Sequence, residues 1–331
     1  MDPQLEAEVQ QALDQVASSD VPARRSGASA LVDLACEPGA GGTLIAHLVL
    51  LLSDRDPELR AAACAGLRAC APRDELAAHV EPLLRDPAAP VRREATRTLA
   101  SLERASVAPQ LRAALQDADA QVGFEAATGL AALRDGSGVE ILLAAVDDSV
   151  RRFAALGALA QLGEARARPA AEAILSKFFV SDFDRTQAAG VLAKLNVEAG
   201  RERLLSRLDR ARAEDRGLAM ELCGEHRVLA AIPALRRCLH DANDPFRGTA
   251  ARSLGLLGED PSGATLDRLA SDVHEDFDVR CDAMEGLMFL GTSGALTALR
   301  RLAAEGEIPA VRSAAEDALA WLASAAPDRV P

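Results

Sequence analysis

The stretch NDPFRGTAARSLGLLGED, residues 243–260, contains the pattern that decides the fold. In this stretch Arg247 is followed by Ala250 three positions later and by Leu254 seven positions later. The same arrangement returns in FDVRCDAMEGLMFLG, residues 277–291, with an arginine, an alanine and a leucine at the same spacing. Spacings of three and seven place side chains on one face of an α-helix. The sequence therefore predicts a repeated helix with an arginine near its start.

Alignment on this arginine gives ten copies of the repeat, with a period of about 32 residues. The arginine is absent from the fourth copy, where Gly123 stands, and the leucine is absent from the seventh, where Cys223 stands. The registers of the fifth and seventh copies are the least well defined. The arginines of the other nine copies are Arg24, Arg60, Arg92, Arg152, Arg185, Arg216, Arg247, Arg280 and Arg312.

Each copy also has an earlier short apolar segment, such as IPALRRCLHD at residues 232–241. Turns such as DANDPF lie between the two segments, and their Asp, Asn and Pro residues suit the start of a second helix. Helices this short cannot bury an apolar face alone, so neighbouring copies must stack. We therefore predict an all-α, right-handed α-solenoid of about ten helix-turn-helix repeats, with the second helices on the concave side. The repeats are expected to form a single domain over residues 1–331, with a short tail at 324–331.

Composition limits the classes of partner. Of the 331 residues, 49% are hydrophobic and 3% aromatic, so the core must consist of alanine, leucine and valine. The net charge of -13 opposes binding to a phosphate backbone, and we expect no nucleic-acid partner.

The acidic first residues do not resemble a signal peptide, and the apolar run at 43–52 is too short to cross a bilayer. We expect a cytoplasmic protein without membrane insertion.

The turn aspartate followed by Val-Arg-x-x-Ala-x-x-x-Leu-x-x-Leu-Gly resembles HEAT repeats of the short bacterial type called PBS-lyase HEAT-like repeats. The match is clearest at residues 90–102, 244–258, 278–291 and 309–322, and it extends over about residues 3–323. The resemblance implies a scaffold in which each second-helix arginine reaches the turn aspartate of a neighbouring repeat. The large excess of arginine over lysine fits a bacterial source.

Aromatic residues depart from the repeat. Five of the eight phenylalanines fall in copies four to six: Phe124, Phe153, Phe178, Phe179 and Phe183. They are interpreted either as gap fillers and an irregular turn, or as an apolar anchor for a partner. Phe124 is expected to line the concave surface. The predicted protein-binding residues, on the second helices of copies three to six, are Arg93, Glu94, Arg97, Phe124, Glu125 and Lys194.

No catalytic, cofactor-binding or metal-binding residues are predicted. The five histidines are scattered, the six cysteines form no CxxC pair and are expected to be small buried residues, and no Gly-rich phosphate loop, GxSxG or HExxH motif is present. We therefore predict a non-enzymatic scaffold or adaptor that binds another protein through its concave surface. The resemblance also implies an alternative, a protein similar to the bilin lyases that attach chromophores to phycobiliproteins, or the chaperone subunit of such a lyase.

Overall fold

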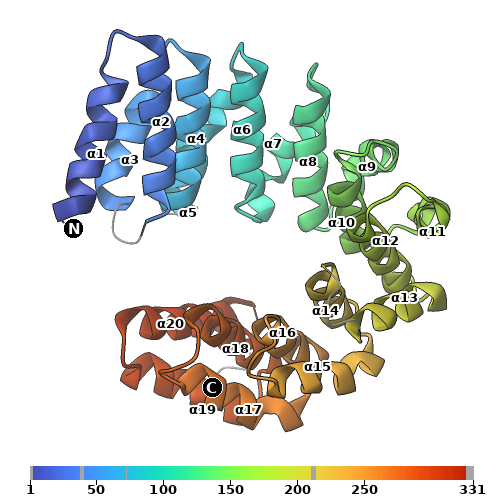
Figure 1. Ribbon diagram of the computed structural model, residues 1–331. Coiled ribbons are helices and arrows are strands. Elements are labelled where there is room, and N and C mark those ends of the chain that lie inside the picture. Colours follow the sequence, from blue (N-terminus) through green and yellow to red (C-terminus); the bar gives the residue numbers. More distant parts are fainter. Residues whose placement is uncertain (1–2, 38–40, 72, 210–213, 326–331) are drawn as a thin grey trace. The chain divides into compact units, whose positions relative to one another are not determined.

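The computed structural model describes residues 3–37, 41–71, 73–209 and 214–325. These residues form twenty α-helices and no strand (Figure 1). The chain divides into two compact units, Met1–Leu162 and Gly163–Pro331, here called unit 1 and unit 2. The predictions of an all-α fold and of about twenty helices in helix-turn-helix pairs are confirmed, whereas the single domain and the right-handed, concave form stay predictions.

The helices alternate as the first and second members of ten pairs. Unit 1 contains α1 (Pro3–Val16), α2 (Val21–Ala35), α3 (Gly41–Leu51), α4 (Pro57–Cys70), α5 (Arg73–Val80), α6 (Ala89–Ala100), α7 (Ala108–Ala114), α8 (Ala120–Ala132), α9 (Val139–Ala145) and α10 (Arg152–Leu162). Unit 2 contains α11 (Arg168–Ser176), α12 (Asp182–Lys194), α13 (Glu198–Leu208), α14 (Arg216–Glu225), α15 (Ile232–His240), α16 (Arg247–Leu257), α17 (Gly263–Ser271), α18 (Phe277–Leu290), α19 (Ser293–Glu305) and α20 (Pro309–Ala325). The first two residues of the predicted tail are thus helical, and 326–331 lie outside the described residues.

Second helices pack against one another in chain order within each unit, as α2, α4, α6 and α8 do in Figure 1. Their buried faces form an apolar core of leucine and alanine in each unit. The leucine positions of the repeat lie in this core: Leu159 and Cys223, from the two least certain copies, are both fully buried. The predicted register therefore holds in the fifth and seventh repeats, and each unit is an α-solenoid of stacked helix pairs.

Gly255, which follows the repeat leucine Leu254, allows two second helices to approach closely. Gly255 on α16 faces the backbone of Gly286 on α18, and a Cβ atom on Gly255 would overlap that backbone. Any larger side chain at this position would force the two helices apart. Gly255 thus permits the close packing of α16 on α18.

Turn aspartates cap the second helices as predicted. The carboxylate of Asp56 accepts a hydrogen bond from the backbone N–H of Glu58 at the start of α4, and Asp119 accepts from two N–H groups at the start of α8. These bonds satisfy donors that have no partner within the helix. The turn sequence therefore determines where each second helix begins.

In six repeats of the described chain, the repeated arginine joins its repeat to the next. Arg60 Nε and Nη2 donate to the two carboxylate oxygens of Asp86, in the next turn, over 2.7 and 2.8 Å. Arg92 binds Asp117 in the same bidentate manner over 2.8 and 2.9 Å. Such charge-assisted, two-point bonds fix both distance and orientation. We call each of these pairs a rung, and the rungs are Arg24–Asp54, Arg60–Asp86, Arg92–Asp117, Arg216–Asp244, Arg247–Glu275 and Arg280–Glu307.

The same arginines also bind the first helix of their own repeat. Arg24 Nε donates to the carbonyl of Val16 over 3.1 Å, and Arg216 Nε donates to the carbonyl of Leu208 over 3.1 Å. Val16 and Leu208 are the last residues of α1 and α13, where helix carbonyls lack partners. One guanidinium group thus joins two helices of one repeat and the turn of the next, which confirms the predicted ladder.

Leu254→Ala should lower the free energy of unfolding by roughly 2 to 5 kcal/mol, because the side chain is fully buried and its removal leaves a cavity. Chemical denaturation of the whole chain gives the value. Leu229→Ala is the matched control, since Leu229 is largely exposed in the same unit and its truncation should change stability far less. A loss below about 1 kcal/mol for Leu254→Ala would contradict the assigned core.

Replacing Gly123 by arginine should restore the missing rung of unit 1. A Cβ atom at Gly123 would lie 3.4 Å from the carbonyl oxygen of Leu115, the type of group that rung arginines bind. The carboxylate of the next turn is Asp148, which already pairs with Arg151 and would have to accept from both arginines. Gly123→Ala is the control, because it gains helix propensity of about 1 kcal/mol without a guanidinium. Denaturation should show Gly123→Arg more stable than Gly123→Ala by about 1 kcal/mol. Equal stability of the two variants would show that the rung adds nothing there.

Stability should fall in acid because the rung carboxylates have depressed pKa values in the folded protein. The hydrogen bond from Arg92 lowers the pKa of Asp117; at Asp86 burial disfavours the charge, but hydrogen bonds from Arg60 and the Ala88 N–H outweigh it and lower the pKa. Their contribution is complete above the unfolded pKa of about 4 and disappears as pH falls through the folded value. Asp86→Asn should therefore be less stable than the wild type at pH 7, with a smaller difference near about pH 2.5 in urea titrations. A difference independent of pH would exclude this contribution.

Candidate functional site

Five of the six predicted binding residues lie on two neighbouring second helices of unit 1. Arg93, Glu94 and Arg97 are on α6, and Phe124 and Glu125 are on α8. The sixth, Lys194, is the last residue of α12 in unit 2 and is half-buried. The site is therefore built mainly from α6 and α8. The preceding second helix, α4, adds one residue, Arg68, which pairs with Glu94.

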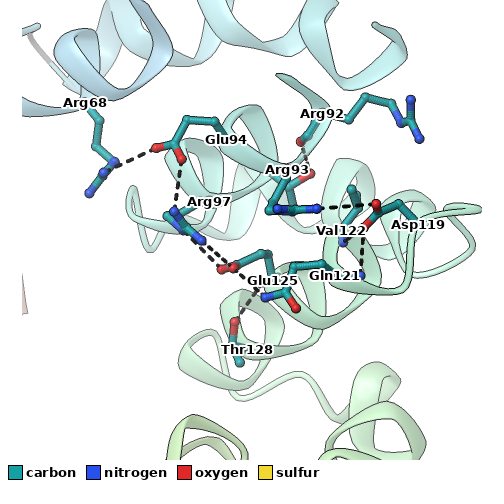
Figure 2. Close-up of polar contacts among 11 residues, drawn as sticks. Arg68, Arg92, Arg93, Glu94, Arg97, Asp119, Gln121, Val122, Glu125 and Thr128 are labelled. Atoms are coloured by element: carbon teal, nitrogen blue, oxygen red, sulfur yellow. Dashed lines mark hydrogen bonds and ion pairs between the residues drawn. The ribbon is translucent and has the colours of Figure 1, made fainter. Parts of the chain in front are cut away.

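Glu94, Arg97 and Glu125 form a chain of ion pairs between α6 and α8 (Figure 2). Arg97 Nη1 donates to Glu94 over 3.0 Å, within one helix turn, and Arg97 Nη2 donates to Glu125 on α8 over 2.7 Å. The hydrogen bond from Arg97 to Glu125 raises the pKa of Arg97, so this side chain stays charged. Gln121 Nε2 donates to the same Glu125 oxygen over 3.1 Å. These contacts hold Arg97 in one orientation.

Arg93 extends from the same helix toward the turn before α8. Its Nη2 donates to the Asp119 carboxylate over 3.4 Å (Figure 2), and Asp119 also caps α8 through the backbone N–H groups of Gln121 and Val122. The Arg93 side chain is thereby attached to a rigid helix start.

The sequence did not point to Arg68, which completes the chain of ion pairs. Arg68 lies in the last turn of α4, and its Nη2 donates to Glu94 over 3.3 Å. The available signal was that Arg68 is the sole charged residue among 61–70, a segment rich in alanine. We define the charged track as Arg68, Arg93, Glu94, Arg97 and Glu125.

The expectation that Phe124 lines an exposed surface is wrong. Only 4% of this residue is exposed, and the Arg151 guanidinium lies over its ring at 5.6 Å from the centroid. The ring is buried and is covered by a cation, an arrangement that stabilises it inside the unit. Truncation of Phe124 would therefore act on stability, and the ring is unavailable to a partner.

The other four phenylalanines of these repeats are exposed. In unit 2, Phe178 is 92% exposed and Phe179 is fully exposed, in the turn between α11 and α12. Arg185 Nη2 donates to the carbonyls of Lys177 and Phe178 over 2.7 and 3.1 Å, which fixes the backbone of this turn. Arg185 therefore holds two aromatic rings in solvent where the preceding repeats have a polar turn.

Metal-ligand clusters and membrane-spanning helices are the next features to consider. In the ranges given above, no three His, Cys, Asp or Glu side chains come together as metal ligands, and no helix is both long and apolar enough to span a membrane.

Cys64, Cys223 and Cys238 are buried, and desolvation raises the pKa of each to about 12. Cys36 is exposed, so the expectation that all six cysteines are buried is wrong for this residue.

Comparison with known proteins agrees with this architecture. The family model described as HEAT repeats matches residues 45–123 and 77–160. No curated protein matches the chain.

Several solved structures are similar to the chain at low sequence identity. An engineered protein is 20% identical, with 95% of this chain and 98% of that chain covered and a TM-score of 0.42. The complex of CpcE and CpcF of phycocyanin lyase from Nostoc sp. is 20% identical, with 85% and 93% covered and a TM-score of 0.41. Kap121p is 14% identical, with 98% and 46% covered and a TM-score of 0.42. The family model for HEAT repeats matches within residues 45–160, and the same helix pairs and arginine rungs lie on either side of that segment.

Proposed function

We propose that this protein is a non-enzymatic adaptor that binds another protein through the exposed face of the second helices of unit 1. The observation that carries the proposal is the charged track: its arginines are anchored by ion pairs and yet remain partly exposed. Binding surfaces gain affinity when their side chains are already ordered before the partner arrives. Arginine is also among the residue types that contribute most to protein interfaces.

Small side chains around the track support the same proposal. Ala61, Ala62 and Ala65 are partly exposed on α4, and Ala69 is exposed beside Arg68 in the last turn. Side chains this short leave the helix surface open, so a partner segment could lie close to the backbone and still reach the arginines. Flat, sparsely covered helix faces of this kind suit an extended binding surface in a repeat protein.

The exposed Phe178–Phe179 turn supports protein binding in unit 2. Adjacent exposed aromatic rings are unfavourable in water and are typical of surfaces that another protein covers. Since Arg185 fixes the turn, little order would be lost when these rings are buried in a partner.

A photoreactive amino acid placed at Ala69 should crosslink to a partner in cells of the source organism, because Ala69 lies beside Arg68 on the exposed face of α4. The same group at Ala113, exposed on the first helix α7, is the matched control and should give no crosslink to that partner. Mass spectrometry of the crosslinked products identifies the partner. Crosslinking from Ala113 and none from Ala69 would move the binding surface to the first helices.

A further inference from the structure

We infer that the partner segment recognised by the charged track is an acidic peptide, whose carboxylates bind the exposed guanidinium groups of Arg68, Arg93 and Arg97. This inference rests on the proposed protein-binding function and specifies the chemistry of the partner. It follows from the difference in solvent exposure between the arginines and the carboxylates of the track.

In each ion pair of the track the arginine is the exposed member. The Arg68 side chain is 39% exposed and the Arg97 side chain 43%, whereas Glu94, which binds both, is 14% exposed and Glu125 is 15% exposed. The carboxylates thus lie beneath the guanidinium groups, and an approaching molecule meets positive charge first. The whole chain has a net charge of -13, and the carboxylates paired with the track arginines bring the summed charge of the track close to neutral, but the outermost groups on α4 and α6 are guanidinium groups.

The exposed arginines retain hydrogen-bonding capacity. A guanidinium group has five N–H donors in a planar fork that matches a carboxylate. Within the described part of the chain, Arg68 donates one hydrogen bond, from Nη2 to Glu94 at 3.3 Å. An incoming carboxylate can accept from the remaining donors of Arg68 without breaking that bond.

Single exposed arginines above buried carboxylates also occur elsewhere, as at Arg112 and Arg236, but the track places three of them on two neighbouring second helices. The equivalent second helix of unit 2 has a different arrangement. On α16, Arg252 lies five residues after the rung arginine, as Arg97 does on α6, and it pairs with Glu285 over 3.0 Å. There the carboxylate is the more exposed partner, with 47% of Glu285 exposed against 39% of Arg252. Arg252 therefore provides a matched position without the outward cationic character.

Protein carboxylates fit the track better than a nucleic acid does. Three arginines on two helices present a short cationic patch, whereas a nucleic acid needs a long basic surface that follows its backbone. Beyond the patch, the excess of 50 acidic over 37 basic residues would repel a phosphate chain. A short acidic segment can place its carboxylates on the three arginines without extending over the acidic surface around them.

The test is the binding of a fluorescent glutamate-rich peptide to the full chain, measured by fluorescence anisotropy at about 0.01 M salt, where charge interactions are least screened. The wild type should bind this peptide, and the triple variant R68Q/R93Q/R97Q should bind at least about tenfold more weakly. R97Q alone should weaken binding, whereas R252Q, which removes one positive charge at the position that matches Arg97, should stay within about twofold of the wild type. Thermal melts followed by circular dichroism establish that each variant is folded. If the triple variant is unfolded, peptide binding is measured with R68Q alone, because this substitution removes the fewest contacts.

Glu94→Gln separates recognition from a structural role. This substitution weakens the same ion pairs as the arginine variants but removes a competing negative charge, so peptide binding should become tighter. Weaker binding by Glu94→Gln, equal binding by the triple variant, or no binding by the wild type would overturn the inference. It would also be overturned if a single-stranded oligonucleotide bound more tightly than the peptide. A partner crosslinked from Ala69 whose capture is unaffected by R68Q/R93Q/R97Q would leave the proposed function standing and the acidic-peptide inference refuted.

Discussion

Stacking is organised by the contact between an arginine at the start of one second helix and a carboxylate in the next turn. Six repeats of the described chain make this contact, and it is bidentate at Arg60, Arg92 and Arg216. Helices of this length are marginal alone, and their alanine-rich faces become stable only when neighbouring repeats stack. Arg60 and Asp86 illustrate why the same residues recur: the arginine binds its own turn and the next one, while the aspartate also accepts the N–H of Ala88. A single pair therefore sets helix start, repeat spacing and repeat orientation together.

The charged track uses the same chemistry at a different depth. In five of the six rungs both side chains are largely withdrawn from solvent, as at Arg92 and Asp117, and Glu307 is the exposed exception. Such buried pairs serve the packing of the repeats. In the track the carboxylates remain below the surface while Arg68 and Arg97 reach solvent. Burial of both partners gives stacking, whereas burial of the acid alone gives an anchored cation that faces outward. Arg112 and Arg236 show this order singly on first helices, whereas Arg68, Arg93 and Arg97 lie together on two neighbouring second helices. This clustering is the reason for assigning recognition to α4 and α6.

The scaffold could be predicted from the sequence because its information is local and repeated. The spacing of Arg247 and Leu254 fixed one helical face, and repetition fixed the stacking. The surface could not be predicted in the same way, since it depends on contacts between repeats. Phe124 was placed outside because its cover, Arg151, comes from the next repeat, and Arg68 was missed because its partner lies on the neighbouring helix. Exposure of a side chain at a fixed repeat position thus varies with what the adjacent repeat carries.

Arginine-specific labelling with phenylglyoxal, read by mass spectrometry, tests the central claim most directly. The protein would be labelled alone and in complex with its captured partner. The account predicts that the partner protects Arg68, Arg93 and Arg97, while Arg112, exposed on the first helix α7 and paired with Asp135, is labelled equally in both states. Protection of Arg112 with unchanged labelling of the three track arginines would contradict the account.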